Sequence, residues 1–511
     1  MTPNQYTPEE PISSIATALA PAALGIVRVS GKNCIELVSK VFSRPKALLE
    51  AAGNTLVYGW ILDNAQKVDE VMLAVYRAPK SFTGEDMVEI FCHGGPSVVT
   101  AIQNLMLKIG FRQANRGEYT FRAYINGKTD LTKAEAIKEI IDSHTDVSRS
   151  HAAGRLSGSL YKEIDSIKKL IVDTLAAIEV EIEYPEDEET IADSFDRKDI
   201  EEAINRLQSL VDSWKSEKLY QDGARVVLAG RTNAGKSSLF NAILKEERAI
   251  VSDIEGTTRD WLESWASING IPVRLFDTAG LRKTDDIIEA KGVEISRNLA
   301  QDADVVLYLV DGTGGLNEED KAFIENCGEP LVVVFTKCDL PVEEKGSGVL
   351  GDAKNDVQPS GKGTPTINTN VPLGEGVADK PTKRNEATLT AEAVRGETWL
   401  GSEGKAFPSL KISSKTGSGM AELYAQITKI LTSGTTTERE QAGLGSARQK
   451  EAVSEALECT KHALVSADDN YTLDAVVQDL EDALDALGEV TGDVTPDDVL
   501  GSIFANFCVG K

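Results

Sequence analysis

A short apolar run that leads into a glycine-rich loop constrains the fold of this chain more than any other feature. Residues 225–229 read as a buried strand, and residues 230–237 have the pattern G-x-x-x-x-G-K-S and open a helix. The glycines let backbone N–H groups close around phosphates, Lys236 places its charge on the β and γ oxygens, and the hydroxyl of Ser237 suits magnesium. The pattern therefore predicts a parallel sheet with helices on both faces and a nucleoside triphosphate bound at its edge.

Three further elements follow the loop in the order that such a nucleotide site requires. Residues 277–280, 336–339 and 413–415 each come at the end of an apolar run that reads as a strand. Asp277 can reach the ligand shell of a bound metal, and the amide of Gly280 can reach the γ-phosphate. One such loop can arise by chance, but four elements in this order predict a nucleotide site.

The identity of the base is predicted from Asp339. Its carboxylate can accept hydrogen bonds from N1–H and the exocyclic amine of guanine, whereas N1 of adenine is itself an acceptor. Thr336 stands where the usual guanine motif has Asn, so we expect the site to lose a bracing amide and to bind nucleotide less tightly. The nucleotide-binding candidates in the four elements are Asn233, Ala234, Gly235, Lys236, Ser237, Ser238, Asp277, Thr278, Ala279, Gly280, Thr336, Lys337, Asp339, Ser413, Ser414 and Lys415.

These motifs do not identify the group that orients the attacking water. GTPases of the Ras type carry Gln directly after D-x-x-G, but Leu281 stands here, and an aliphatic side chain cannot orient water. The polar residues nearby that remain as candidates are Arg282, Asp285, Asp286 and Glu289. Residues 256–260, between the loop and D-x-x-G, are the candidate switch, in which Thr258 can bind magnesium when GTP is present.

With 511 residues the chain predicts about three domains, and changes in periodicity give their order. Residues 1–122 mix β-type runs with helical stretches and predict a small α+β domain. Residues 123–222 and 438–511 share helical periodicity and predict one discontinuous helical domain. Residues 223–437 hold the nucleotide motifs and predict an inserted P-loop G domain, so the fold class is multidomain α/β. Within that domain, residues 343–406 lack periodicity and predict a disordered low-complexity insertion.

Charge, hydropathy and cysteine content narrow the class of protein. With 54 Lys and Arg against 81 Asp and Glu, the net charge is −27 and no basic run occurs, so a nucleic-acid substrate must be held locally or by a partner. The apolar runs are far shorter than the roughly 20 residues of a membrane span. The six cysteines form no C-x-x-C pair, and the first eleven residues resemble neither a signal nor a transit peptide. We therefore expect a soluble, cytoplasmic protein.

Several stretches together closely resemble the bacterial MnmE/TrmE family of tRNA-modification GTPases. They are residues 25–31, 81–86, 93–96, 122–128, 130–136, 230–238, 256–260 and 507–511. The N-terminal and C-terminal stretches are absent from GTPases in general, which makes the resemblance specific. It implies a potassium-activated GTPase that, with a flavoprotein partner, uses a folate one-carbon unit to form 5-carboxymethylaminomethyluridine at the wobble position of certain tRNAs.

The resemblance also implies roles for residues by position. Cys508 would lie beside the one-carbon unit of 5-formyl- or 5,10-methylene-tetrahydrofolate, and Glu289 would orient the attacking water through a second water. The implied folate contacts are Arg28, Glu89, Lys128 and Lys511. The implied potassium ligands are Asn233, Ser252, Ile254 and Thr257, and the magnesium ligands are Ser237 and Thr258. The implied switch contacts to nucleotide are Ser252, Asp253, Ile254, Glu255, Gly256, Thr257 and Thr258.

The implied partners are a second copy in a homodimer, with the tail reaching the folate pocket of the other subunit, and an FAD-dependent protein in a heterotetramer that holds most of the tRNA. Other functions remain open. A regulatory GTPase of ribosome assembly would need an RNA-binding module, and no basic stripe is present. A G-domain scaffold without one-carbon chemistry would leave residues 1–122 unable to bind tetrahydrofolate. Arg28 and Glu89 alone fit a strand-edge ion pair, and Cys508 alone fits a buried small hydrophobe.

Overall fold

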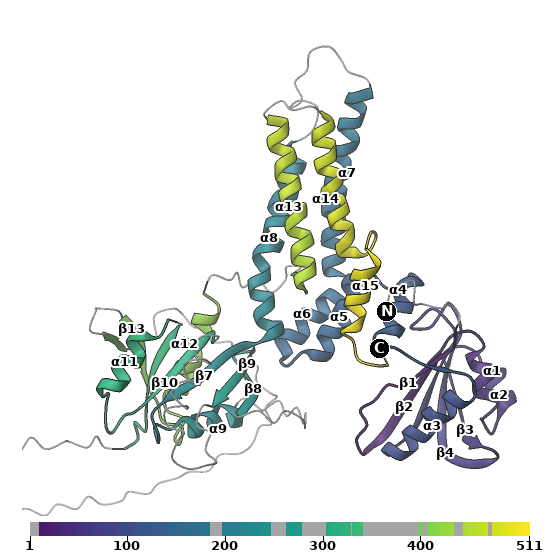
Figure 1. Ribbon diagram of the computed structural model, residues 1–511, viewed down its shortest axis with the longest axis horizontal. Helices are drawn as coiled ribbons and strands as arrows, with labels where there is room; N and C mark the ends of the chain where they lie inside the picture. Colours follow the sequence, from purple (N-terminus) through teal and green to yellow (C-terminus); the bar gives the residue numbers. More distant parts are fainter. Residues whose placement is uncertain are drawn as a thin grey trace, which may run out of the picture.

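The computed structural model describes residues 10–183, 197–246, 262–277, 303–328, 330–340, 397–400, 406–433, 443–468 and 473–510. A helical domain stands between two sheet domains, one formed by the start of the chain and one inserted between the two halves of the helical domain (Figure 1). In the described part of the chain, no helix is both long enough and apolar enough to cross a membrane.

The N-terminal domain is a six-stranded sheet in the order β3-β4-β5-β2-β1-β6. Its pairs are antiparallel except for β1 with β6. Val27, Leu73 and Ile90 lie side by side on three neighbouring strands and are fully buried. Their face of the sheet packs in one core with helices α1 and α3. The elements are β1 (Ile12–Ile15), β2 (Ala22–Ser30), α1 (Cys34–Ser39), α2 (Pro45–Leu49), β3 (Thr55–Asp63), β4 (Gln66–Tyr76), β5 (Met87–Gly94), α3 (Pro96–Lys108) and β6 (Arg112–Gln113).

The helical domain is built from two segments of the chain that share one core. Ile164 and Leu207 of the first segment pack in the same buried cluster as Val453 and Leu480 of the second. The first segment contains α4 (Glu118–Ile125), α5 (Leu131–Asp142), α6 (Asp146–Leu156), α7 (Ser159–Glu183) and α8 (Arg197–Asp222). The second contains α13 (Ala447–Asp468), α14 (Leu473–Thr491) and α15 (Asp497–Ala505). Helix α4 runs across the predicted boundary at residue 122 and so joins the two domains.

The inserted domain has a seven-stranded sheet in the order β12-β13-β11-β10-β7-β9-β8. The five central strands are parallel, and each edge strand is antiparallel to its neighbour. The predicted parallel sheet is therefore correct at the centre and wrong at both edges. Its elements are β7 (Ala224–Gly230), α9 (Lys236–Glu246), β8 (Leu262–Ile268), β9 (Ile271–Asp277), β10 (Val305–Asp311), α11 (Glu318–Asn326), β11 (Leu331–Thr336), β12 (Glu397–Leu400), β13 (Ala406–Lys411) and α12 (Met420–Leu431).

The predicted insertion at residues 343–406 needs a correction at its C-terminal end. Residues 397–400 form β12, which pairs with β13 from Glu397 opposite Ser409 to Leu400 opposite Ala406. The prediction failed here because a four-residue strand is too short to give a periodic signal. The remainder of the predicted insertion, apart from Ala406 at the start of β13, lies outside the described residues.

Candidate functional site

The phosphate loop closes around its own lysine. Gly230 and Gly235 have φ angles of 131° and 93°, and a Cβ at Gly230 would lie 2.3 Å from the carbonyl O of Leu309. These positions therefore require glycine. The ammonium of Lys236 donates to the carbonyl oxygens of Gly230 at 2.6 Å and Arg231 at 2.8 Å. The loop thus surrounds the Lys236 ammonium and places its positive charge where phosphates would bind.

Two side chains that could bind a metal ion through oxygen, those of Asp277 and Ser237, meet beside this loop. Asp277 ends β9, which runs parallel to β7 with Leu228 opposite Asp277, and only 1% of this residue is exposed. The hydroxyl of Ser237 donates to Oδ2 of Asp277 at 3.0 Å. Because magnesium prefers hydroxyl and carboxylate oxygens, Ser237 and Asp277 fit a Mg²⁺ ion that would neutralise phosphate charge.

The predicted guanine-binding residue Asp339 is held by the fourth sequence element. The hydroxyl of Ser413 donates to Oδ1 of Asp339 at 2.8 Å, and this hydrogen bond lowers the pKa of the exposed carboxyl. The backbone N–H of Cys338 also donates to the carbonyl O of Ile412 at 3.2 Å. The two loops are thereby joined, and Asp339 is kept ionised, as it must be to accept hydrogen bonds from guanine.

Thr336 still connects its own loop to the phosphate loop. Its side chain is buried, and its hydroxyl lies 2.8 Å from the carbonyl O of Ala234 and 3.2 Å from that of Val310. A hydroxyl has one proton, so the shorter contact, to the phosphate loop, is the better hydrogen bond. The expectation of a lost brace is therefore wrong in its structural part. The substitution of Thr for Asn replaces an amide by a hydroxyl that still ties this loop to the phosphate loop.

Asp311 belongs to the same loop cluster and was missed by the sequence reasoning. Its Oδ2 lies 2.5 Å from Nζ of Lys337, and its Oδ1 accepts hydrogen bonds from the N–H and hydroxyl of Thr313. The side-chain hydrogen bond from Lys337 is the main cause that lowers the pKa of Asp311. The signal that could have found it is its place directly after the apolar run of β10, the position shared by Asp277 after β9.

Some predicted residues cannot be placed in this cluster. Asn233, Ser238 and Lys415 are exposed around the loops and Ser414 is half-buried. Asn233 has a φ of 62°, which shows a left-handed turn inside the phosphate loop. The predicted residues that lie outside the described part are Ser252, Asp253, Ile254, Glu255, Gly256, Thr257, Thr258, Thr278, Ala279, Gly280, Glu289 and Lys511.

A second group of predicted residues meets on the N-terminal sheet. Arg28 of β2 lies opposite Glu89 of β5 and donates through Nε at 2.9 Å and Nη2 at 2.7 Å to the same carboxylate oxygen. The remaining nitrogen, Nη1, donates to the carbonyl O of Gly510 at 3.1 Å. The ion pair that the sequence left open is therefore present. Within this single chain, the tail contacts its own N-terminal domain.

Two other features border this cluster. Cys508 is exposed, and its carbonyl O accepts from the N–H of Gly117 at 3.4 Å. Lys128 donates to the carbonyl O of Pro79 at 3.0 Å, in the segment that leads to Phe82. The guanidinium of Arg28 lies 5.5 Å from the ring centroid of Phe82. The structure thus gathers Arg28, Glu89 and the tail, with Lys128 on the neighbouring loop.

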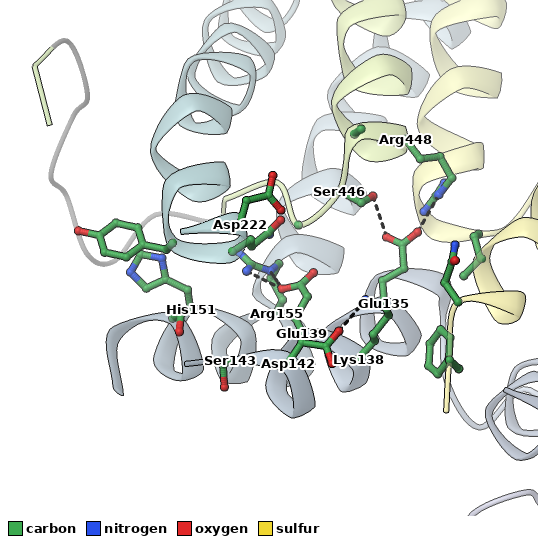
Figure 2. Close-up of a pocket in the computed structure, with 18 of the residues that line it drawn as sticks. Glu135, Lys138, Glu139, Asp142, Ser143, His151, Arg155, Asp222, Ser446 and Arg448 are labelled. Carbon is green, nitrogen blue, oxygen red and sulfur yellow. Dashed lines mark hydrogen bonds and ion pairs between the residues drawn. The ribbon is translucent and has the colours of Figure 1, made fainter. Parts of the chain in front are cut away.

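A cavity of about 990 Å³ lies at the base of the helical domain, where the inserted domain and α15 also line it. On its wall Arg155 pairs with Glu139 at 2.6 Å and Arg448 pairs with Glu135 at 2.9 Å (Figure 2). Behind the wall, Arg155 also pairs with Glu217 at 2.7 Å. None of the site residues predicted from the sequence is among the residues that line this cavity in the described part of the chain.

Comparisons with known proteins agree across the chain. The family model described as the N-terminus of the GTP-binding protein TrmE matches residues 11–128, and the model described as the MnmE helical domain matches residues 131–508. A tRNA modification GTPase MnmE of Treponema denticola is 47% identical and one of Treponema pallidum is 43% identical, and each alignment covers at least 99% of both chains. A solved structure of Era from Aquifex aeolicus is 19% identical with a TM-score of 0.24, and the alignment covers 46% of this chain and 66% of that one. The chain therefore belongs to the MnmE family of tRNA modification GTPases.

Proposed function

We propose that this GTPase, with an FAD-dependent partner protein, uses a folate one-carbon unit to form 5-carboxymethylaminomethyluridine at the wobble position of tRNA. The observation that carries the proposal is the hydrogen bond from Arg28 to the carbonyl O of Gly510. It fixes the tail so that Cys508 lies at the edge of the N-terminal domain. A thiol in this place can act on a carbon unit held beside Arg28, because thiolates are strong nucleophiles.

The surroundings of Arg28 suit a flat, polar ligand such as tetrahydrofolate. Phe82 and Tyr119 each place a ring centroid 5.5 Å from the guanidinium. The hydroxyl of Ser81 is buried and has no hydrogen-bond partner in the described part of the chain. We infer that Glu89 and Arg28 hold the ring system, while Lys128 and Lys511 attract the carboxylate end. When bound, the folate supplies the one-carbon unit.

The uncovered face of the N-terminal sheet supports a homodimer. Leu24, Leu56, Tyr58 and Met72 are between 44% and 64% exposed, and the sheet register puts them all on the face opposite α1 and α3. Tyr58 lies directly across from Met72. Apolar side chains gathered on one sheet face mark an interaction site, and a second copy of the chain offers the same apolar face.

The G domain is proposed to use potassium in hydrolysis. Asn233 is exposed in the phosphate loop, where its side-chain oxygen can reach an ion beside the phosphates. The other proposed ligands are Ser252, Ile254 and Thr257, and Glu289 is proposed to orient the attacking water. A cation at this position would stabilise the charge that develops during phosphoryl transfer, as an arginine finger does in other GTPases.

The decisive experiment is the substitution Cys508→Ser. A hydroxyl nearly matches the thiol in size but is far less acidic, so GTP hydrolysis should persist while the modified wobble uridine disappears from cellular tRNA, measured by nucleoside mass spectrometry. The matched control is Cys459→Ser in α13, far along the chain from the tail, which should keep both activities. Modified uridine in a strain with only the Cys508→Ser protein would contradict the proposal.

A further inference from the structure

We infer that Asp311 is a positioning residue of the guanine site, which holds Lys337 and through it the base-binding loop of residues 336–339. The inference deepens the proposed nucleotide site and rests on the placement of guanine against Asp339. Asp311 ends β10, next to β11, and the register puts Asp311 opposite Thr336. It therefore lies beside the loop at the point where the loop leaves the sheet.

Both carboxylate oxygens of Asp311 are committed by the structure. Oδ1 accepts from the N–H of Thr313 at 3.0 Å and from its hydroxyl at 2.7 Å, which fixes the rotation of the carboxylate. Oδ2 is left to face Nζ of Lys337 at 2.5 Å. The lysine therefore meets an acceptor whose direction is already set, and such pre-organisation favours one geometry of a charge-assisted pair.

The ion pair with Asp311 stabilises Lys337 in a backbone conformation that is unfavourable for most residues. Its φ is 59°, a left-handed conformation that a residue with a long side chain seldom adopts. The backbone around it is tied on the same side, because the N–H of Gly312 donates to the carbonyl O of Thr336 at 3.0 Å. A Cβ at Gly312 would lie 2.5 Å from that oxygen, so the close approach requires glycine.

The backbone conformation of Lys337 sets the position of Asp339, two residues further along the chain. The left-handed turn at Lys337 directs the chain toward Asp339, whose carboxylate is held from the other side by Ser413. The loop is thus fixed at one end by Asp311 and at the other by Ser413. Without the pull of Asp311, Lys337 can return to an ordinary backbone conformation, which moves Asp339 away from the base.

The test is the equilibrium affinity of Asp311→Asn for fluorescent GDP at low and high salt. The amide keeps the size and one oxygen for Thr313 but removes the charge. Asp311 and Lys337 are about one-third exposed, so the dissociation constant should rise about fivefold at low salt, the upper range for an exposed pair. At ~1 M salt the Debye length falls to about 3 Å, so the difference in affinity should be smaller than at low salt.

Three controls make the result specific. Glu318→Gln breaks the exposed Glu318–Lys321 pair, 2.8 Å long in the same domain, and should leave the affinity unchanged. A circular dichroism spectrum and a melting temperature close to those of the wild type would show that Asp311→Asn folds. Asp339→Asn should shift the preference from GDP to XDP, and failure of this shift alone would refute the guanine placement. Wild-type affinity of Asp311→Asn at low salt, or an equal loss at both salt concentrations, would overturn the role of Asp311.

Discussion

Substitution of Arg155 by Met should show how much of the free energy of unfolding depends on this one buried cation in the wall of the cavity. Only 3% of the Arg155 side chain is exposed, and it pairs with Glu139 and Glu217, whose side chains are 13% and 10% exposed. Met fills a similar volume but leaves both carboxylates without their cation. Breaking a buried pair in this way costs about 3–5 kcal/mol of unfolding free energy.

The size of this loss should depend on pH. Burial already raises the pKa of Glu139, whereas hydrogen bonds from His151 and Arg155 outweigh the burial of Glu217 and lower its pKa. Without Arg155 the pKa of Glu139 rises further, so the folded state takes up a proton that the unfolded state releases. Stability of the variant then falls as the pH rises above the unfolded pKa of Glu139. The variant should be closest to wild type near pH 5 and furthest from it near pH 8.

The assay is thermal and urea unfolding followed by circular dichroism at both pH values. The helical domain dominates the signal at 222 nm, so its transition can be followed in the full chain. The control is Arg206→Met, which removes a pair with Glu163 from an arginine that is 26% exposed and should cost ~1 kcal/mol or less. A loss for Arg155→Met below ~1 kcal/mol at pH 8, or an equal loss at pH 5, would refute the reasoning.

Three further outcomes concern the GTPase cycle. Replacing potassium by sodium should slow hydrolysis by at least tenfold, and Asn233→Ala should remove most of that response; equal rates in both salts would count against a potassium site. Glu289→Ala should lower the turnover number and leave GTP affinity nearly unchanged, because the group acts in the transition state; a loss mainly in affinity would assign it to binding. Thr336→Val should weaken GDP binding about tenfold because it leaves the carbonyl of Ala234 without its hydrogen-bond donor. Thr336→Ser keeps the hydroxyl and should not weaken binding. Equal losses in both variants would point to packing of the methyl group.

The sequence predicts the central strands of the inserted domain well because each is buried on both faces. In β7, Val226 and Leu228 pack into one core while Val227 and Ala229 pack into another. Such strands read as continuous apolar runs followed by their functional loops. The sequence reasoning did not find the edge strands β8 and β12. In β8, Ala266 and Ile268 are buried while Ser267 between them is only half-buried, and β12 has only four residues, so neither strand gives a continuous apolar run.

Side-chain partners are harder to predict than motifs. The motif Thr-Lys-Cys-Asp predicts which loop would meet the base, but not that Thr336 contacts the phosphate loop or that Lys337 meets Asp311. These contacts depend on the register between β10 and β11, which no local pattern encodes. The contact of Arg28 with Gly510 joins residues 482 positions apart and depends on the two halves of the helical domain packing together.

One strand connects the nucleotide site with the cavity in the helical domain. β9 ends at Asp277 beside Ser237, and three residues earlier Arg274 lines the cavity opposite Trp265 of β8. The indole of Trp265 stacks on His144 with ring centroids 3.8 Å apart, and the guanidinium of Arg274 lies 4.7 Å from the indole centroid. The helical domain therefore contacts, through His144, the pair of strands whose end carries Asp277, although no predicted nucleotide-binding residue lines the cavity in the described part of the chain.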